Sequence, residues 1–208
     1  MELILVRHGQ TAWNVEEIFR GRADVELNEA GRRQAVLLGE FLSDRRIEVV
    51  YSSPLKRARD TALAIARHHD LDVRISEGLN DMDFGEWEGM PVDAVKARYP
   101  EAYAEWYNHP ELARVSGGEM LGRVRERATA VVKDVVAAHQ GRVVLVTHRV
   151  IVKILTLAML GLDESRFWNV VVDTCGATTF RVSDGRNVLV RHNDTSFLKS
   201  SGASLADF

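Results

Sequence analysis

Residues 3–9 read LILVRHG, an apolar run that ends in an arginine, a histidine and a glycine. Short runs rich in leucine, isoleucine and valine are typical of buried strands in a largely parallel sheet. Open α/β folds bind ligands at the carboxyl ends of such strands, so we expect Arg7 and His8 to lie at that edge. In a continuing strand the two side chains would point to opposite faces. We expect Gly9 to permit a sharp turn that brings both toward one crevice.

Two further apolar runs predict strands that also end in polar residues. Val143–Val146 leads into Thr147-His148-Arg149, and Val49–Tyr51 is followed by Ser53-Pro54 and then Arg57. Because the carboxyl ends of parallel strands meet at one edge of a sheet, we expect these side chains to converge on the first histidine. Backbone N–H groups at the start of a following helix would favour a phosphate there. The pattern therefore predicts a phosphate pocket.

Helical patterns lie between and after these strands. Asn28 is predicted to cap one helix, and Ser53 with Pro54 to cap and open the next. Apolar residues at three- or four-residue spacing predict a long helix over Gly118–His139 and another over Val150–Leu160. This alternation of strands and helices indicates an α/β protein.

We predict a three-layer, doubly wound α/β fold, with a mostly parallel sheet and helices on both of its faces. Residues 169–191 alternate in polarity and would complete the sheet as edge strands, with a turn at Ser183-Asp184-Gly185. Residues 79–117 differ in character, because acidic side chains are interleaved with aromatic residues and glycines. We expect a single domain over residues 1–208, with a cap inserted at about residues 79–117.

The composition argues against several classes of function. A total of 27 Lys and Arg against 30 Asp and Glu gives a net charge of −3, which speaks against a nucleic-acid partner or a membrane partner. The apolar start of the chain is too short for a signal sequence or a membrane span. Cys175 is the only cysteine, which excludes an intrachain disulfide framework and favours a reducing, cytoplasmic compartment. The histidines show no metal-ligand spacing, so neither a metal nor another cofactor is expected.

Four motifs together resemble the histidine phosphatase superfamily, which includes cofactor-dependent phosphoglycerate mutases and many small phosphatases. The most specific is LVRHGQT at residues 5–11 with Asn14, supported by SSPLKRA at 52–58, FGEWEG at 84–89 and VTH at 146–148. The resemblance runs from Leu3 to about Leu198. The chain looks most like small bacterial phosphatases such as metal-independent phosphoserine phosphatases and α-ribazole phosphatases.

The resemblance implies roles for five residues of the predicted phosphate pocket. His8 would be the nucleophile, while Arg7, Arg57 and His148 would hold the phosphoryl oxygens. Asn14 matches a further position that hydrogen-bonds phosphate in the family. This chemistry is reasonable, because a neutral imidazole can attack phosphorus in line while cationic partners offset the charge on the oxygens. Water can then cleave the phosphohistidine.

The acid that protonates the leaving group departs from the family pattern. Asp81 stands where the family usually has a glutamate, so the carboxylate is kept but is one methylene shorter. A general acid must come within hydrogen-bond reach of the leaving oxygen. Asp83 is therefore a possible substitute for Asp81, and Glu86 and Glu88 are more distant ones.

Two arginines also replace the usual residues around the pocket. Arg149 follows the second histidine, where the family commonly has glycine, and its side chain either turns to solvent or reaches a second anionic group of the substrate. Arg20 with Gly21 falls at the substrate entrance, where Arg20 replaces the commoner glutamine. Together the two arginines would favour a substrate that carries a carboxylate or another phosphate.

We predict a metal-independent phosphomonoester hydrolase that forms a phosphohistidine and acts on a small phosphorylated metabolite. One alternative is a phosphoglycerate mutase-type phosphotransferase, although the basic, proline-containing insertion of those mutases is missing. Another is a sensor that binds phospho-ligands without turnover, should neither Asp81 nor Asp83 reach the leaving oxygen. A scaffold without phosphate affinity is a third. A homodimer could use Phe167 and Trp168 as an apolar surface, but internal packing explains those residues equally well.

Overall fold

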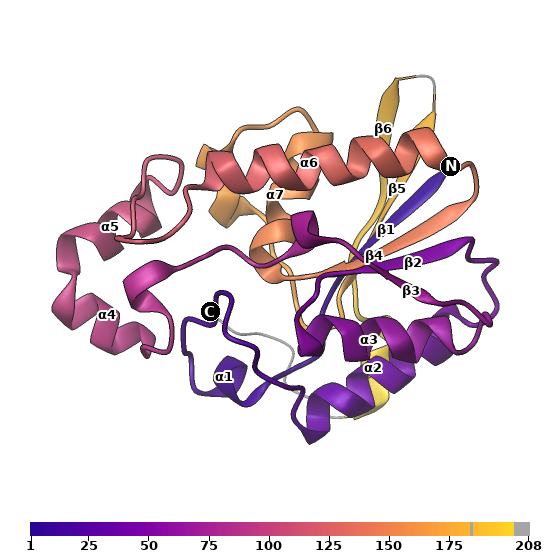
Figure 1. Ribbon diagram of the computed structural model, residues 1–208, viewed down its shortest axis with the longest axis horizontal. Coiled ribbons are helices and arrows are strands. Elements are labelled where there is room, and N and C mark those ends of the chain that lie inside the picture. Colours follow the sequence, from indigo (N-terminus) through magenta and orange to yellow (C-terminus); the bar gives the residue numbers. More distant parts are fainter. Residues whose placement is uncertain (184, 202–208) are drawn as a thin grey trace.

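A computed structural model describes residues 1–183 and 185–201, and its centre is a six-stranded sheet (Figure 1). The strands lie in the order β3-β2-β4-β1-β5-β6. They are β1 (Glu2–Arg7), β2 (Val49–Ser52), β3 (Val73–Ile75), β4 (Arg142–Thr147), β5 (Ala177–Ser183) and β6 (Arg186–Asp194). The predicted strands are confirmed, and the short edge strand β3 adds one that the apolar pattern did not indicate.

The sheet is mixed rather than wholly parallel. β1 pairs in parallel with β4, with Leu3 opposite Val143 and Arg7 opposite Thr147, and β4, β2 and β3 continue the parallel arrangement. Among the described strands only β5 runs against the others, because it is antiparallel to both β1 and β6. The two tail strands complete the sheet as expected, but only β6 lies at its edge, because β5 pairs on both sides. Asp184, in the predicted turn between them, lies outside the described residues.

Helices cover both faces of the sheet, as the α/β prediction requires. They are α1 (Ala12–Val15), α2 (Glu29–Leu42), α3 (Lys56–Ala66), α4 (Val92–Arg98), α5 (Pro100–Asn108), α6 (Leu121–Ala138) and α7 (Arg149–Met159). Leu3 and Leu5 of β1 share one apolar core with residues of α6 and α7, while Ile4 and Val6 share another with α2 and α3. Alternate side chains of a strand point to opposite faces, which explains the two cores.

The helix starts test the capping predictions. Asn28 caps α2 as expected, because its side chain accepts a hydrogen bond from the Gly31 N–H at 2.8 Å. The prediction that Ser53 caps α3 is wrong. The N-cap of α3 is Leu55, which makes no side-chain cap bond, and the Ser53 hydroxyl faces His148 instead.

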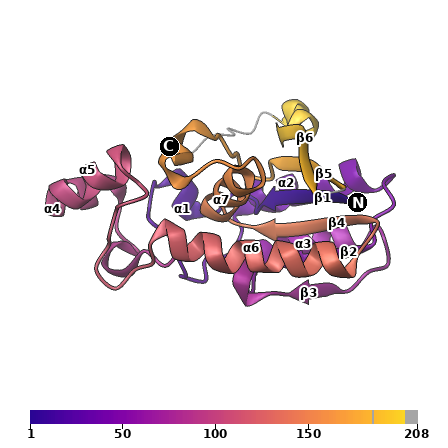
Figure 2. The same cartoon turned by 90° about the horizontal axis from the view of Figure 1, so that it is seen from above.

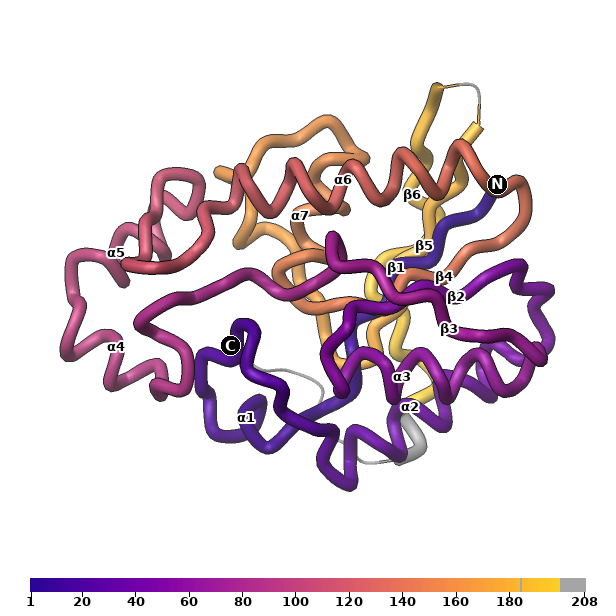
Figure 3. The backbone as a smooth tube through the Cα atoms, viewed as in Figure 1, coloured from indigo at the N-terminus to yellow at the C-terminus, as the bar shows by residue number. Residues whose placement is uncertain are grey.

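The segment predicted to be a cap holds α4 and α5, which stand off one end of the molecule in two views (Figures 1 and 2). The chain leaves the sheet after the short 3₁₀ helix Glu77–Leu79 and returns to it through α6 (Figure 3). Trp87 and Trp106 are buried in this region, while Tyr107 is exposed. Short 3₁₀ helices also occur at Gly85–Trp87, Glu164–Asn169 and Ser196–Ser201. The division into one domain with an inserted cap stays a prediction.

Within residues 1–183 and 185–201, no helix combines the length and the apolar character that crossing a membrane requires.

Candidate active site

Two histidines meet at the carboxyl ends of the neighbouring strands β1 and β4. The His8 N–H donates to the Thr147 carbonyl at 2.9 Å, which continues the strand pairing into the site. His8 and His148 are both buried, and their ring centroids lie 5.2 Å apart. The convergence predicted from the two strand ends is therefore present.

The His8 ring presents an unprotonated nitrogen. Its Nδ1 lies 2.6 Å from the Gly9 carbonyl oxygen, which can only accept a hydrogen bond. The proton of the neutral ring must then be on Nδ1, and Nε2 keeps its lone pair. Burial, followed by the charges of Arg57, Arg7 and Arg20, holds the pKa of His8 well below its usual value. A buried neutral imidazole of this kind has the protonation state that a nucleophile needs.

Gly9 is needed for a reason other than the predicted sharp turn. Its φ is not in the left-handed region. A Cβ at this position would lie 2.5 Å from the Gly31 carbonyl oxygen of α2, a distance that real Cβ atoms do not reach. The glycine therefore permits close approach of two backbones.

Arg57 makes hydrogen bonds to four other residues of the site. The fully buried guanidinium donates to the Gly21 and Ala23 carbonyls at 2.8 and 2.7 Å. It also donates to Asp81 Oδ2 at 3.2 Å and to His148 Nδ1 at 3.3 Å. The five N–H groups of an arginine allow one side chain to organise this many acceptors. Arg57 thus joins the start of α3 to the entrance loop, the predicted acid and the second histidine.

His148 uses both ring nitrogens. Nδ1 accepts from Arg57, and Nε2 lies 2.8 Å from the Ser53 hydroxyl. Burial, and then the charges of Arg57 and its neighbours, holds the pKa of His148 well below its usual value. Sequence reasoning missed the contact to Ser53, because a serine before a proline and a helix reads as an ordinary cap.

Arg7 and Asn14 complete the set that the motifs predict. Arg7 is fully buried, and its Nη1 donates to the Val172 carbonyl at 2.8 Å. Asn14 Oδ1 accepts from the Thr11 N–H at 2.8 Å and from the Thr11 hydroxyl at 2.9 Å. Because its oxygen faces Thr11, the amide directs its NH₂ donors elsewhere.

Asp81 lies in the histidine cluster, and the other candidate acids lie in the cap. Asp81 Oδ2 is 3.5 Å from His148 Nδ1, in addition to its contact with Arg57. Asp83 accepts from the Gly85 N–H and faces Arg22. The two glutamates are also held by cap or entrance groups, Glu86 by Tyr99 and Ser116, and Glu88 by the N–H groups of Arg22 and Phe84.

A narrow pocket brings the two unusual arginines to the predicted acid. Arg20, Gly21, Asp81 and Arg149 line it together with the Phe84 ring and residues next to them. Its volume is about 20 Å³, which is room for about one water molecule, so a larger ligand requires these side chains to move. Arg149 is largely buried, so its side chain does not turn out into solvent. Gly21 has φ +49°, a conformation that residues with a side chain rarely adopt, and a Cβ there would contact the Glu88 carboxylate.

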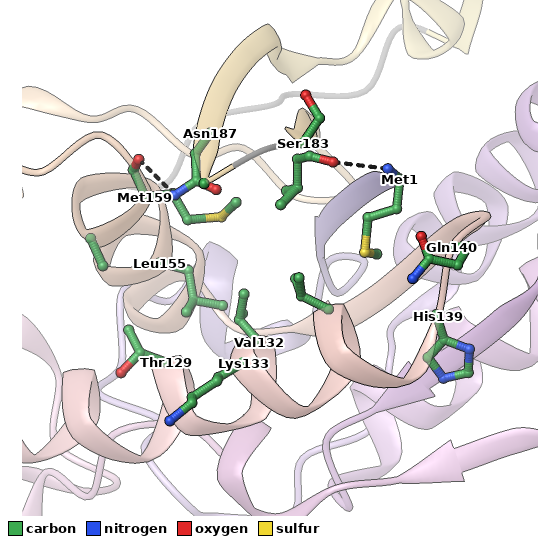
Figure 4. Close-up of a pocket in the computed structure, with 14 residues that line it drawn as sticks. Met1, Thr129, Val132, Lys133, His139, Gln140, Leu155, Met159, Ser183 and Asn187 are labelled. Carbon is green, nitrogen blue, oxygen red and sulfur yellow. Dashed lines mark hydrogen bonds between the residues drawn. The ribbon is translucent and has the colours of Figure 1, made fainter.

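A roomier groove of about 500 Å³ lies at the other end of β1 (Figure 4). Met1, at the start of that strand, lines it together with Leu155 and Met159 of α7 and Val132 of α6. The larger cavity in this protein is therefore not the candidate active site. The histidines with lowered pKa values indicate that site instead.

The buried histidines give the fold a pH dependence that can be measured. In the unfolded chain each would bind a proton near pH 6.5, while both stay neutral in the folded protein well below that pH. The unfolded state then binds more protons, so stability falls as the pH is lowered from 6.5. We expect each histidine to contribute a loss of about 1.4 kcal/mol per pH unit in this window.

Urea denaturation between pH 7 and 5, carried out on the protein and on the His8→Gln variant, measures how much of the pH dependence of the unfolding free energy comes from His8. All other titrating groups are common to the two proteins, so the variant should lose stability less steeply. Equal slopes would show that His8 is protonated in the folded state.

Among residues 1–183 and 185–201, no group of three or more His, Cys, Asp or Glu side chains is arranged to hold a metal ion. The side chains that meet at this edge of the sheet are two buried imidazoles, buried guanidinium groups and the Asp81 carboxyl group.

Known proteins share both the sequence and this architecture. A model of the histidine phosphatase superfamily (branch 1) matches residues 3–195. Phosphoserine phosphatase 1 of Hydrogenobacter thermophilus is 37% identical over 199 residues, covering 95% of this chain and 94% of that protein. The structure of Bacillus stearothermophilus YhfR has a TM-score of 0.91 at 30% identity and covers 95% of this chain and 99% of its own. The α-ribazole phosphatase of Shigella flexneri has a TM-score of 0.86 at 27% identity, with 93% and 96% covered. The resemblance expected from the motifs is confirmed, and the chain belongs to the histidine phosphatase superfamily (branch 1).

Proposed function

We propose that the protein is a metal-independent phosphomonoester hydrolase that acts on a small phosphorylated metabolite through a phosphohistidine at His8. One observation carries the proposal: the buried His8 imidazole, with its proton on Nδ1, has an unprotonated Nε2 and lies among the buried guanidinium groups of Arg57 and Arg7. Activated nucleophiles and preorganised positive charge are the two requirements for phosphoryl transfer by a side chain. Its relatives named as phosphatases support the same activity.

In the first step, the Nε2 lone pair of His8 attacks phosphorus in line with the leaving oxygen. An N–P bond forms and the P–O bond to the leaving group breaks. The Asp81 carboxyl group, in its protonated form, gives its proton to that oxygen and becomes a carboxylate. Arg7, Arg57 and Asn14 offset the charge on the phosphoryl oxygens. In the second step, water attacks phosphorus, Asp81 takes one of its protons, and His8 is released.

His148 would also donate to the phosphoryl group, and Ser53 makes this possible. A hydroxyl can either donate or accept, so the proton of the ring can be on either nitrogen while the 2.8 Å contact is kept. When a phosphoryl oxygen arrives on the Nδ1 side, the Arg57 Nε–H gives up its bond to Nδ1 and donates to that oxygen instead. The ring can then donate from Nδ1 while Ser53 donates to Nε2. The buried pair thus adapts to the ligand without a net change of charge.

Phosphate release with EDTA present, together with trapping of labelled phosphate on the protein, tests the proposal. We expect hydrolysis of phosphomonoesters to persist in EDTA, and alkaline quenching at early times to leave label on His8 that is stable in alkali and lost in acid. The His8→Ala variant should trap none. Turnover that persists in this variant would disprove the mechanism.

The assignment of Asp81 as the acid predicts a dependence on the leaving group. We expect Asp81→Asn to slow phosphoryl transfer from an alkyl phosphate such as phosphoserine by about 10²-fold or more, since alkoxide leaves poorly without a proton. Transfer from p-nitrophenyl phosphate should slow by less than about 5-fold, because nitrophenolate needs no proton. Rapid-quench measurement of the first turnover isolates this step. A larger effect of Asp83→Asn would move the assignment to Asp83.

We propose that the substrate carries a second anionic group, held by Arg149 and Arg20. Both residues line the pocket beside Asp81, where we expect the part of the substrate beyond the phosphoryl group to lie, and Arg20 Nη1 also donates to the Trp13 carbonyl at 3.1 Å. Arginine binds carboxylate and phosphate with two parallel hydrogen bonds. Phosphoserine carries a carboxylate that could serve as this second anionic group, whereas α-ribazole phosphate has none.

Removing Arg149 tests the substrate class. We expect Arg149→Ala to raise KM for phosphoserine by about 10-fold and to leave KM for p-nitrophenyl phosphate within about 2-fold. Arg123→Ala, on the exposed side of α6, is the matched loss of positive charge and should change neither value. An equal rise in KM for both substrates would indicate that Arg149 binds the phosphoryl group.

The sensor alternative is less favoured, because Asp81 lies beside His148 rather than away from the pocket. The homodimer stays a prediction. Phe167 is fully buried and packs against Trp106 and Trp168, so internal packing accounts for it. The cytoplasmic compartment also stays a prediction.

A further inference from the structure

Arg127 of α6 binds the loop that carries Asp81. Its Nη1 donates to the Gly78 and Asn80 carbonyls at 3.0 and 2.6 Å, and its Nη2 donates to the Asp81 carbonyl at 2.9 Å. Its Nε and Nη2 also bind the Glu119 carboxylate at 3.0 and 2.9 Å. One side chain therefore holds three backbone carbonyls within four residues.

Glu119 ties this arginine to the cap. Its Oε2 accepts from the Asp83 N–H at 3.0 Å and lies 3.2 Å from Arg22, while its own N–H donates to the Asp83 carbonyl at 2.8 Å. Burial raises the pKa of Glu119, but hydrogen bonds from Arg127 and Asp83 and the nearby positive charges outweigh this and lower it overall. The ionised carboxylate thus fixes the orientation of the Arg127 guanidinium.

The loop has little freedom of its own once these bonds form. The Leu79 carbonyl, between two of the arginine-bound carbonyls, accepts from the Thr147 hydroxyl at 2.6 Å. Successive carbonyls from Gly78 to Asp81 are therefore all held by side chains from α6 and the end of β4. An aspartate carboxyl lies only two bonds from its Cα, so the position of this backbone decides where it can reach.

We infer that Arg127, oriented by Glu119, is a positioning residue that sets the Asp81 carboxyl against the leaving oxygen of the substrate. Arg127 itself binds backbone carbonyls and Glu119 and acts through Asp81. The inference rests on the proposed function, because it assigns Arg127 to the protonation step alone. It predicts that replacing Arg127 has the same kinetic effects as removing the Asp81 proton. Phosphate binding should not be weakened.

Rapid-quench phosphoryl transfer to the whole protein, with two substrates, tests this. We expect Arg127→Met to slow transfer from phosphoserine by about 10- to 100-fold and transfer from p-nitrophenyl phosphate by less than about 3-fold. The substrate concentration that gives half-maximal transfer should change little. In the double variant with Asp81→Asn, the loss should equal that of Asp81→Asn alone, since a misplaced acid and an absent acid are equivalent. Arg123→Met, on the same helix but with an exposed side chain, should behave as the unmodified protein.

Equal slowing of both substrates, or additive losses in the double variant, would overturn the inference. Glu119→Gln and Arg127→Lys provide a second measurement should Arg127→Met not fold. Each variant keeps part of the hydrogen-bond network. Each should therefore slow transfer from phosphoserine more than transfer from p-nitrophenyl phosphate, but by less than Arg127→Met does. If neither variant changes the ratio of the two transfer rates, the inference is also overturned. These outcomes are separate from the proposed function, which fails if the unmodified protein traps no phosphate on His8 or if turnover persists in His8→Ala.

Discussion

Replacing His8 with alanine is expected to lower kcat for phosphomonoester hydrolysis by at least about 10⁴-fold. The ring supplies the only atom in the proposed mechanism that bonds to phosphorus, and the pocket around it holds cations that cannot take its place. Loss of a nucleophile typically removes nearly all of the covalent catalysis and leaves the contribution of binding and electrostatics. Steady-state phosphate release with phosphoserine measures the effect.

Two controls separate lost chemistry from lost structure. His192→Ala removes a histidine of β6, at the far side of the sheet order from β4, and should retain full activity. Free imidazole should restore part of the activity of His8→Ala, because the deleted ring leaves a cavity beside Arg57 and Arg7. Near-normal turnover in His8→Ala, without imidazole, would mean that another group attacks phosphorus.

Replacing Arg57 with alanine is expected to affect catalysis and folding together. We expect kcat to fall by about 10³-fold, as happens when preorganised charge stabilisation is removed from an enzyme. We also expect the free energy of unfolding to fall by about 3–5 kcal/mol, because the Asp81 carboxylate and the carbonyls of Gly21 and Ala23 lose their buried donor. Urea denaturation and steady-state kinetics measure the two effects.

Two variants of α3 separate charge from geometry at this position. Arg57→Lys keeps the charge but cannot reach four acceptors at once, so it should recover only part of the activity and the stability. Arg59→Ala, an exposed neighbour on the same helix, should change the free energy of unfolding by less than about 0.5 kcal/mol. An unchanged free energy of unfolding in Arg57→Ala would contradict the view that the hydrogen bonds of Arg57 hold the site together.

The sequence predicts the strand ends well because two independent signals agree there. An apolar run marks β1 and β4, and the histidine after each run marks the edge where ligands bind. The parallel register then brings His8 and His148 together without any further information. The family motifs add the identity of Arg7 and Arg57, which composition alone would assign to the surface.

The remaining features depend on contacts between segments that are distant in sequence. Ser53 looks like a helix cap, and only the fold shows that its hydroxyl faces a histidine 95 residues away. Nothing in the sequence indicates that Arg127 contacts the Asp81 loop, because a charged residue on an amphipathic helix is normally solvated. The Val73–Ile75 strand is three residues long and mostly exposed, so its apolar pattern is too short to be recognised.

The close approach of Gly9 to α2 has a consequence for motion. A Cβ on Gly31 would in turn lie 2.0 Å from the Gln10 carbonyl oxygen, so no side chain separates the two backbones. The backbone of Gln10 is also bound on both sides, because its carbonyl accepts from the Asn28 N–H and its N–H donates to Gln34 Oε1. The segment that carries His8 and the start of α2 therefore form one mechanical unit. Any displacement of that helix displaces the nucleophile with it.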